Sequence, residues 1–327
     1  MYSFPYIHTY SDTTPQQMFE NLKNTVVPIV YQRYRLNGYN KDAPGNINPL
    51  PPKYRNIPTF IDASNVSYDD VDGVSDWFNE DVRIRGRKIY KNKSSYELWK
   101  ENPQNLQILT KNQIKKYRNT LWKNNSELNP FRPSWAKTLM KIFKQELKDN
   151  YKILDISAGW GDRLIAAISI DADYTGYDPN LELKNGHDNI IKMFGSHEKQ
   201  RIIYQPFELS EMTDTYDLVL SSPPFFDLEI YSDDETQSTS MYKDFNTWRD
   251  MFLMKSLFKA WNALKINGIM AIHISDFSKL NIVRYMLDKV SNFPECNWLG
   301  VIGLKGESGD IRPVWIWQKI STDNKEI

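Results

Sequence analysis

The residues best suited to chemistry lie in one stretch, Asp217-Leu-Val-Leu-Ser-Ser-Pro-Pro-Phe-Phe226. Its apolar run, Leu218 to Leu220, predicts a short buried strand, which the prolines end because proline cannot donate to a sheet ladder. Pro223 also restricts Ser222 to an extended or turn conformation. The strand therefore ends on hydroxyls, carbonyls and an aromatic face at one point in space. That combination suits a planar group that carries an exocyclic amine.

A second group of candidate residues is the turn Ile156-Ser-Ala-Gly-Trp-Gly161, between a predicted strand, 151–155, and a predicted helix, 162–169. Glycines let the backbone approach a ligand closely. A dinucleotide-binding turn would carry three glycines and hold a pyrophosphate at the helix start. Here there are two glycines, and Asp155 and Asp162 flank the turn. Their negative charge would repel a pyrophosphate and favour a ligand with an ammonium or sulfonium group.

The elements that must position these residues alternate between strand and helix. Strands are expected at 151–155, 174–177, 201–204, 218–220, 269–274, 298–304 and 313–317, and helices at 134–143, 162–169, 183–194, 248–264 and 280–290. This alternation predicts an α/β fold with a mostly parallel, doubly wound sheet. The connection Lys305–Asp310 is too short for a parallel crossover, so the last two strands are expected to form an antiparallel hairpin.

Four further local predictions follow from single residues or short segments. Asp178 lies 23 residues after Asp155 (178 − 155), at the end of the second strand, where a carboxylate can hold ribose hydroxyls. Ser134 is expected to cap the helix that follows it, and Thr14 to cap a helix from Pro15 to Val27. The stretch 37–52 is dense in turn-forming residues and predicts an irregular connection.

Three of these motifs together resemble those of amino methyltransferases. Leu154-Asp-Ile-Ser-Ala-Gly-Trp-Gly161 is similar to their S-adenosylmethionine loop, Tyr177-Asp-Pro-Asn180 to their ribose carboxylate, and Ser222-Pro-Pro-Phe225 to their catalytic tetrapeptide. Those enzymes methylate the exocyclic nitrogen of cytosine or adenine, and the resemblance covers residues 129–320. The run Ser222–Ser232, with Thr236-Gln-Ser238, also resembles methyltransferases of large phages and giant DNA viruses.

The resemblance implies a Rossmann-like seven-stranded methyltransferase sheet in a domain spanning residues 129–322, with residues 1–128 as an accessory, substrate-recognising region. It implies S-adenosyl-L-methionine as the cofactor and no metal ion. The segment Phe131-Arg-Pro133 would close over the methionine moiety. The cofactor-binding residues implied are Phe131, Pro133, Asp155, Ser157, Ala158, Gly159, Trp160, Gly161, Asp178, Pro179 and Phe207.

The catalytic residues implied are Ser222, Pro223, Pro224 and Phe225. An exocyclic amine is a weak nucleophile, and the Ser222 hydroxyl and the Pro223 carbonyl would accept its two N–H bonds while Phe225 stacks on the base. The serine form of the tetrapeptide is most familiar in N4-cytosine enzymes, so cytosine N4 is favoured over adenine N6. Cys296 is far from the tetrapeptide in sequence, which disfavours attack on cytosine carbon 5 by a thiolate.

The charge distribution suggests a partner. Residues 56–82 carry only acidic charges, and the following segment, Arg83–Lys123, carries twelve basic residues against Glu97 and Glu101. Interleaved with aromatics, such a basic segment predicts contact with nucleic acid. The resemblance to amino methyltransferases implies DNA rather than RNA as the nucleic acid. The alternative is that these charges pair with the acidic block before them. The basic residues are Arg83, Arg85, Arg87, Lys88, Lys91, Lys93, Lys100, Lys111, Lys115, Lys116, Arg118 and Lys123.

Composition excludes other classes of protein. The chain has 327 residues, no net charge, one cysteine and four histidines, which argues against a disulfide framework or a structural zinc site. No signal peptide or membrane span is recognised, so a cytoplasmic protein, in a host cytoplasm or virion factory if viral, is expected rather than a secreted one. The oligomeric state is left open.

Two alternatives remain at this point. Pro-Pro-aromatic tetrapeptides also serve enzymes that methylate glutamine in proteins, although their first residue is normally asparagine rather than serine. A non-catalytic partner subunit with the same fold would usually lose the cofactor turn, which this chain keeps. The segment 227–246 is either a substrate-facing lid or a solvated loop.

Overall fold

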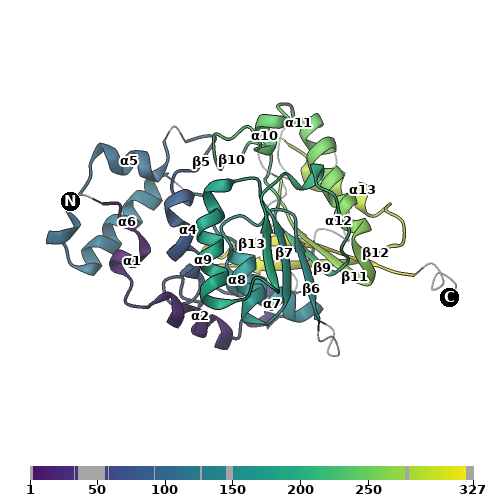
Figure 1. The fold of residues 1–327 in the computed structure, drawn as a ribbon, viewed down its shortest axis with the longest axis horizontal. Coiled ribbons are helices and arrows are strands. Elements are labelled where there is room, and N and C mark those ends of the chain that lie inside the picture. The colour runs from purple at the N-terminus through teal and green to yellow at the C-terminus, as the bar shows by residue number, and fades with distance from the viewer. Residues whose placement is uncertain are drawn as a thin grey trace.

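The sheet is the element that organises the molecule (Figure 1). A computed structural model of the chain describes residues 3–32, 34–35, 56–57, 59–91, 93–125, 127–144, 150–276 and 280–321. Within these residues a nine-stranded sheet has the order β1-β4-β12-β13-β11-β9-β6-β7-β8. The turn-rich stretch 37–52 and residue 322, the expected domain end, lie outside the described residues.

All seven predicted strands are present. They are β6 (Lys152–Asp155), β7 (Asp173–Tyr177), β8 (Gln200–Ile203), β9 (Tyr216–Ser221), β11 (Leu264–His273), β12 (Cys296–Lys305) and β13 (Ile311–Lys319). The neighbours β8, β7, β6, β9 and β11 pair in parallel, whereas β13 pairs antiparallel with both β11 and β12. The predicted fold class, a mostly parallel Rossmann-like α/β sheet with an antiparallel C-terminal hairpin, is confirmed.

Helices cover both faces of the sheet, as Figure 1 shows with α8 and α9 on one side and α12 and α13 on the other. The first face carries α7 (Pro133–Phe143), α8 (Asp162–Ser169) and α9 (Lys184–Phe194), and the second carries η5 (Trp248–Met254), α12 (Lys255–Asn262) and α13 (Ile282–Val290). Side chains on a strand alternate between faces. Accordingly Leu218 and Leu220 pack in the first core, and Val219 packs in the second.

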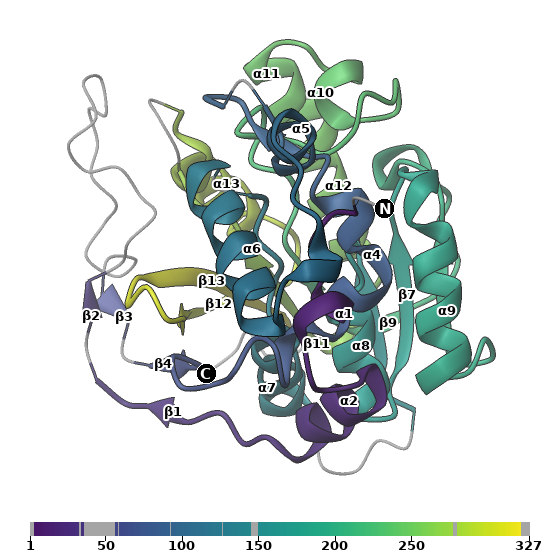
Figure 2. The ribbon, with the colours of Figure 1, turned by 90° about the vertical axis from the view of Figure 1, so that its left-hand side faces the viewer.

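The N-terminal region extends the sheet and adds a helical layer. Strand β4 (Phe60–Asp62) pairs in parallel with β12, and β1 (Ile29–Val30) pairs antiparallel with β4. Strands of two and three residues carry no recognisable periodicity, which is why the sequence did not predict them. Figure 2 shows the short helix α1 (Ile7–Tyr10) and the longer helix α6 (Lys111–Asn125) in front of the sheet. The other elements of this region are α2 (Pro15–Asn24), β2 (Tyr34–Arg35), β3 (Asn56–Ile57), η1 (Asp72–Val74), α4 (Asp76–Arg83), β5 (Arg87–Lys88), α5 (Ser95–Glu101) and η2 (Leu106–Ile108).

Several helix ends differ from the sequence predictions, among them those of α12, which ends at Asn262 rather than Leu264, and α13, which begins at Ile282 rather than Leu280. Helix α2 begins at Pro15 under a Thr14 cap, as predicted, but it ends at Asn24 rather than Val27. Ser134 does not cap α7, because Pro133 already occupies the first helical position. The Ser134 backbone N–H and hydroxyl instead donate to the buried carboxylate of Asp72, at 2.8 and 2.9 Å.

The remaining short elements surround the end of the sheet that carries the tetrapeptide. They are η3 (Leu181–Leu183), η4 (Phe207–Leu209), β10 (Glu229–Ile230), α10 (Ser238–Met241) and α11 (Phe245–Thr247). Strand β10 pairs antiparallel with β5, so the chain after the tetrapeptide is fastened to the N-terminal region. Among the described helices, none has the length and apolar character needed to cross a bilayer.

Candidate active site

A pocket lies at the carboxyl ends of β6, β7, β9 and β11. Neighbouring strands β6 and β9 lead to crossovers on opposite faces of the sheet, and ligands of open α/β sheets bind at such switch points. The predicted site residues that line the pocket are Phe131, Ser157, Ala158, Gly159, Trp160, Asp178, Pro179, Phe207, Ser222, Pro224 and Phe225. The predicted residues Pro133, Asp155, Gly161 and Pro223 are not part of its lining.

The glycine turn forms one wall of this pocket. Gly159 and Gly161 have φ values of +57° and +93°, in the left-handed region that favours glycine. A Cβ on Gly161 would lie 3.0 Å from Ile190 Cδ1, whereas a Cβ on Gly159 would find its nearest atom at 3.9 Å. Gly161 therefore serves packing, and Gly159 leaves open space beside the pocket.

His187 stabilises the same turn through a hydrogen bond to its backbone. Its Nε2 lies 2.8 Å from the Gly159 carbonyl and its Nδ1 lies 3.0 Å from the Tyr204 hydroxyl. Because a carbonyl only accepts, Nε2 carries the proton and Nδ1 accepts from Tyr204. Burial lowers the pKa of His187 to about 4, so the ring stays neutral in this role. No local sequence pattern indicates this contact, because Gly159 and His187 are 28 residues apart.

Asp155 lies beneath the pocket rather than in it. Its carboxylate is fully buried and accepts from Arg163 Nε at 2.6 Å, Tyr174 Oη at 2.6 Å and Ser221 Oγ at 2.7 Å. The expectation that its charge would face a cationic ligand is therefore wrong, because Arg163 already neutralises it. Asp155 instead joins β6 to β7, β9 and α8 at the point where the pocket forms.

The two serines of the tetrapeptide region have separate positions. Ser221 is buried, donates to Asp155 and lies 2.8 Å from the Ser157 hydroxyl, oxygen to oxygen. Ser222 lines the pocket together with Pro224 and Phe225. The strand thus ends in one anchoring hydroxyl and one hydroxyl that faces the pocket.

Asp178 is placed where the sequence predicted it, at the end of β7. Its Oδ2 accepts from the Gly159 N–H at 2.8 Å and its Oδ1 accepts from the Asn180 N–H at 3.0 Å. Burial raises its pKa to about 6, since no cation forms an ion pair with it among the described residues. Each oxygen keeps a lone pair that a ligand hydroxyl can use.

Two further pocket residues hold buried polar atoms without a protein partner. Asn180 Nδ2 and Glu208 Oε2 are both shielded from solvent and make no hydrogen bond within the described residues. Such atoms usually have a partner in native structures, so they leave one donor and one acceptor for a ligand. Glu208 directly follows Phe207, whose ring packs edge-on against Tyr177 with centroids 4.9 Å apart. Neither Asn180, the last residue of the motif 177–180, nor Glu208 was predicted to bind the cofactor, although each adjoins a residue that was.

His273 occupies the end of β11, next to the tetrapeptide. Ile272 pairs with Ser221 across the sheet, so the following residues, His273 and Ser222, leave their strands side by side. Its Nδ1 donates to the Pro313 carbonyl at 2.8 Å, which leaves Nε2 as an acceptor, and its ring contacts Phe225 with centroids 5.8 Å apart. Burial lowers its pKa to about 4. His273 therefore lines the pocket beside Phe225.

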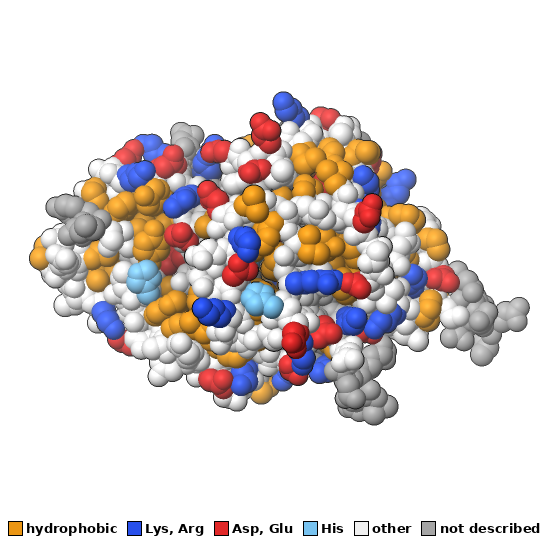
Figure 3. All heavy atoms as spheres, in the orientation of Figure 1, with side chains coloured by type: hydrophobic (Ala, Val, Ile, Leu, Met, Phe, Trp, Pro, Cys, Tyr) orange, Lys and Arg blue, Asp and Glu red, His pale blue; other side chains and the backbone are white. Residues whose placement is uncertain are grey.

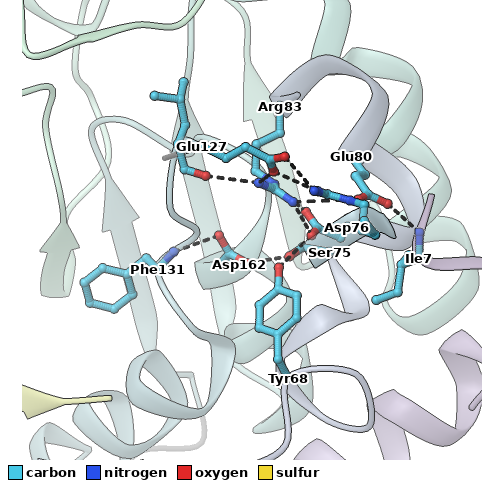
Figure 4. Close-up of polar contacts among 11 residues, drawn as sticks. Ile7, Tyr68, Ser75, Asp76, Glu80, Arg83, Glu127, Phe131 and Asp162 are labelled. Carbon is cyan, nitrogen blue, oxygen red and sulfur yellow. Dashed lines mark hydrogen bonds and ion pairs between the residues drawn. The ribbon is translucent and has the colours of Figure 1, made fainter. Parts of the chain in front are cut away.

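The N-terminal region holds the pocket wall in place (Figure 4). Asp162, the first residue of α8, accepts from the Ser75 hydroxyl and from the Phe131 backbone N–H, the latter at 3.1 Å. Asn79 Nδ2 on α4 donates to the Trp160 carbonyl at 2.9 Å. Segments 75–79, 131 and 160–162 are thereby joined, although they lie far apart in sequence.

A buried ion network underlies this contact, also in Figure 4. Arg83 binds Asp76 through Nε at 2.7 Å and Nη2 at 2.5 Å, and it reaches Glu127 at 2.9 Å. Arg118 binds Glu127 through two nitrogens, at 2.6 and 2.7 Å, and Glu80 at 2.9 Å. Arg83 and Arg118 are 4% and 5% exposed. The predicted contact of the segment Arg83–Lys123 with nucleic acid therefore cannot involve these two arginines.

Several lysines of the same segment also pair locally. Lys115 binds Asp69, Lys111 binds Asp12 at 2.5 Å, and Lys93 binds Glu101. The alternative interpretation, in which the basic charges pair with the acidic block at 56–82, holds for Lys115, Arg83 and Arg118. The partners of Lys111 and Lys93 lie outside that block. Figure 3 shows positive and negative side chains interspersed on one face of the molecule.

Two minor predictions concern residues near the pocket. Cys296 begins β12 and pairs with Lys319, at the edge of the sheet opposite the tetrapeptide, which agrees with the argument against a thiolate mechanism. Within 227–246, the residues Thr236, Gln237 and Ser238 line the pocket. The Tyr242 hydroxyl donates to Glu208 Oε1 at 3.2 Å, so this segment forms a wall of the site.

Comparison with known proteins gives fold-level similarity only. No family model and no curated protein matches the sequence. Among solved structures, the chain is similar to an rRNA methylase from Streptococcus thermophilus (11% identity, 59% of this chain and 100% of that chain, TM-score 0.40). It is also similar to TrmN from Thermus thermophilus (12%, 65% and 69%, TM-score 0.43) and to an S-adenosylmethionine-dependent methyltransferase from Clostridium acetobutylicum (13%, 64% and 99%, TM-score 0.43). TM-scores below 0.5 do not assign the chain to a family.

Proposed function

We propose that this protein is an S-adenosyl-L-methionine-dependent methyltransferase that acts on the exocyclic amino nitrogen of a base in DNA or RNA, with cytosine N4 favoured over adenine N6. One observation carries the proposal. The glycine turn, with Asp178 beside it, and the tetrapeptide Ser222–Phe225 line one pocket at the switch point of the sheet. In this proposal residues 129–322 form the methyltransferase domain, residues 1–128 assist substrate recognition, and the protein acts in the cytoplasm.

The residues present fit the cofactor. S-adenosyl-L-methionine supplies an electrophilic methyl group on a sulfonium. Asp178 would accept hydrogen bonds from its ribose hydroxyls, and Gly159 would let the backbone approach. The unpartnered Glu208 Oε2 would accept from the adenine amine beside the Phe207 ring, and the unpartnered Asn180 Nδ2 would donate to an acceptor on the same ligand.

The residues at the other end of the pocket would hold the target amine. Ser222 Oγ would accept one N–H, and the Phe225 ring would stack on the base, which is worth about 1–3 kcal/mol for an aromatic–base contact. Pro223 is buried and does not line the pocket, whereas His273 Nε2 offers an acceptor beside Ser222. Two acceptors would direct the amine lone pair at the methyl carbon. Methyl transfer would form the N–C bond and break the S–C bond of the cofactor, and the proton that the amine loses would pass to water.

The decisive experiment incubates the protein with isotopically labelled cofactor and mixed DNA and RNA, followed by nucleoside mass spectrometry. We expect labelled N4-methylcytosine or N6-methyladenine, and we expect Ser222→Ala and Phe225→Ala to lose it while cofactor binding persists in calorimetry. Label found only in protein would favour glutamine methylation. A protein that binds no cofactor would be a non-catalytic subunit.

A further inference from the structure

A second cleft opens beside the candidate active site. Its walls come from α6, from the segment around Tyr68, and from the turn Gly306–Asp310 between β12 and β13. Four residues line both this side cleft and the active-site pocket, namely Asn129, Pro130, Trp135 and Arg312. The two hollows are therefore adjacent, and a chain lying in the side cleft can reach the pocket.

The cations that line the side cleft fall into three sets. The first set is Arg83 and Arg118, which line the cleft and belong to the buried ion network. Both are already ion-paired with buried carboxylates. Lys88, Lys123 and Arg312 line the cleft from three separate elements, and among the described residues none of them forms an ion pair or side-chain hydrogen bond.

The other two cations of the lining are already committed. Lys115 pairs with Asp69, and Arg132 pairs with Asp72 and Glu307. The lining cations without an ion pair among the described residues are thus Lys88, Lys123 and Arg312, of which Lys88 and Arg312 also act at longer range to lower the pKa of the buried Glu229 carboxyl.

An aromatic side chain completes the lining. Trp122 on α6 is 46% exposed and lies in the cleft next in sequence to Lys123. The other aromatics of this region, such as Tyr96 and Trp99, pack against the small core around Phe4 instead. A large exposed indole beside uncommitted cations is the combination that binds single strands, because bases stack on the ring while cations bind phosphates.

We infer that the side cleft holds the single-stranded nucleic-acid segment next to the target base, with phosphates at Lys88, Lys123 and Arg312 and a base on Trp122. The inference rests on the proposed function, because it takes the active-site pocket to receive a base. A base that enters the pocket must leave its stack, so the strand beside it is unpaired locally. In this inference only Lys88, Trp122 and Lys123 of the segment Arg83–Lys123 bind the substrate, and the other basic residues of the segment do not.

The test measures the binding of a fluorescent single-stranded 12-mer by anisotropy over a range of salt concentrations. Each phosphate contact on a single strand contributes about 0.7 to the slope of log K against log salt. The double variant Lys88→Gln/Lys123→Gln should therefore lower the slope by about 1.4. Trp122→Ala should weaken binding roughly fivefold or more with the slope unchanged.

A matched control replaces two exposed lysines that line neither hollow, Lys116→Gln/Lys192→Gln, and should keep the wild-type affinity and slope. Circular dichroism and thermal unfolding verify that each variant is folded. The inference is overturned if Lys88→Gln/Lys123→Gln binds like wild type, if the control loses as much, or if a duplex competes better than the single strand.

Cofactor calorimetry and methylation of the 12-mer separate this inference from the proposed function. Lys88 and Lys123 do not line the active-site pocket, so their variant should bind the cofactor as wild type does. If the 12-mer is methylated but its binding is indifferent to the cleft variants, only the side-cleft inference fails. If the protein binds the cofactor but no oligonucleotide, both the side-cleft inference and the proposed nucleic-acid substrate are wrong.

Discussion

Gly159 offers the sharpest test of where a ligand approaches the backbone. Its φ of +57° permits a substitution only with strain, but the space beside it is open, since an added Cβ would find its nearest atom, the Ser157 carbonyl oxygen, at 3.9 Å. In Gly159→Ala the new methyl group should therefore enter the pocket without displacing any protein atom. The change is expected to damage ligand binding more than folding.

The strain can be estimated separately from the ligand effect. An alanine in the left-handed region costs about 1–2 kcal/mol of unfolding free energy. Gly309 supplies a matched control, because its φ is +79°, an added Cβ would meet nothing within 4 Å, and it does not line the active-site pocket. Gly309→Ala should lose a similar unfolding free energy and keep its cofactor affinity.

The assay pairs urea denaturation with calorimetric titration of S-adenosyl-L-methionine. Gly159→Ala should bind the cofactor about tenfold more weakly or worse, which corresponds to ~1.4 kcal/mol or more. Gly161→Ala should instead fail mainly in stability, because its Cβ would crowd Ile190 at 3.0 Å. Wild-type affinity in Gly159→Ala, or an equal loss in Gly309→Ala, would refute the proposed approach of the cofactor.

Three other predictions concern different layers of the site. Arg118→Met should lose about 3–5 kcal/mol of unfolding free energy, measured in urea, because Glu80 and Glu127 would stay buried without this cation; an unchanged midpoint would contradict this. Burial raises the pKa of Asp178 to about 6, so its carboxylate takes up a proton as the pH falls through 6. Cofactor affinity should then weaken below pH 6 and stay level above pH 7, and Asp178→Asn should remove that pH dependence. His273→Phe keeps an aromatic ring beside Phe225 but removes the acceptor, so kcat should fall about tenfold or more with cofactor affinity retained; equal kcat values would count against the histidine.

The fold could be predicted from the sequence because its signals are local. The continuous apolar run Leu218 to Leu220 is typical of a strand buried on both faces, and the structure places these residues in two different cores. The glycines between β6 and α8 are a local signal as well, because a positive φ favours glycine at that one position. Parallel strands then bring their carboxyl ends to one edge, which is why Asp178 and Ser222 could be expected in one pocket.

The roles of charged residues could not be predicted in the same way. Counting charges along Arg83–Lys123 does not distinguish a buried arginine from an exposed lysine, and the partners of Arg118 are 38 and 9 residues away in sequence. The contact between Ser75 and Asp162 spans 87 residues. Such pairings depend on how α4 and α6 pack on the sheet, and no local pattern records that packing.

The electrostatics of the pocket follow from which carboxylates are already neutralised. Asp155, the residue whose charge suggested a cationic ligand, is paired with Arg163 and cannot provide that selectivity. The pocket lining instead holds Asp178, Glu208 and Glu229, whose pKa values burial raises because no cation is paired with them among the described residues. A positively charged ligand would lower the free-energy cost of burying these carboxylates, whereas a pyrophosphate would raise it by charge repulsion. The preference for a sulfonium or ammonium ligand that the sequence suggested is therefore retained. It rests on these three carboxylates and on Asp162, which also lines the pocket with a pKa raised to about 6 by burial, rather than on Asp155.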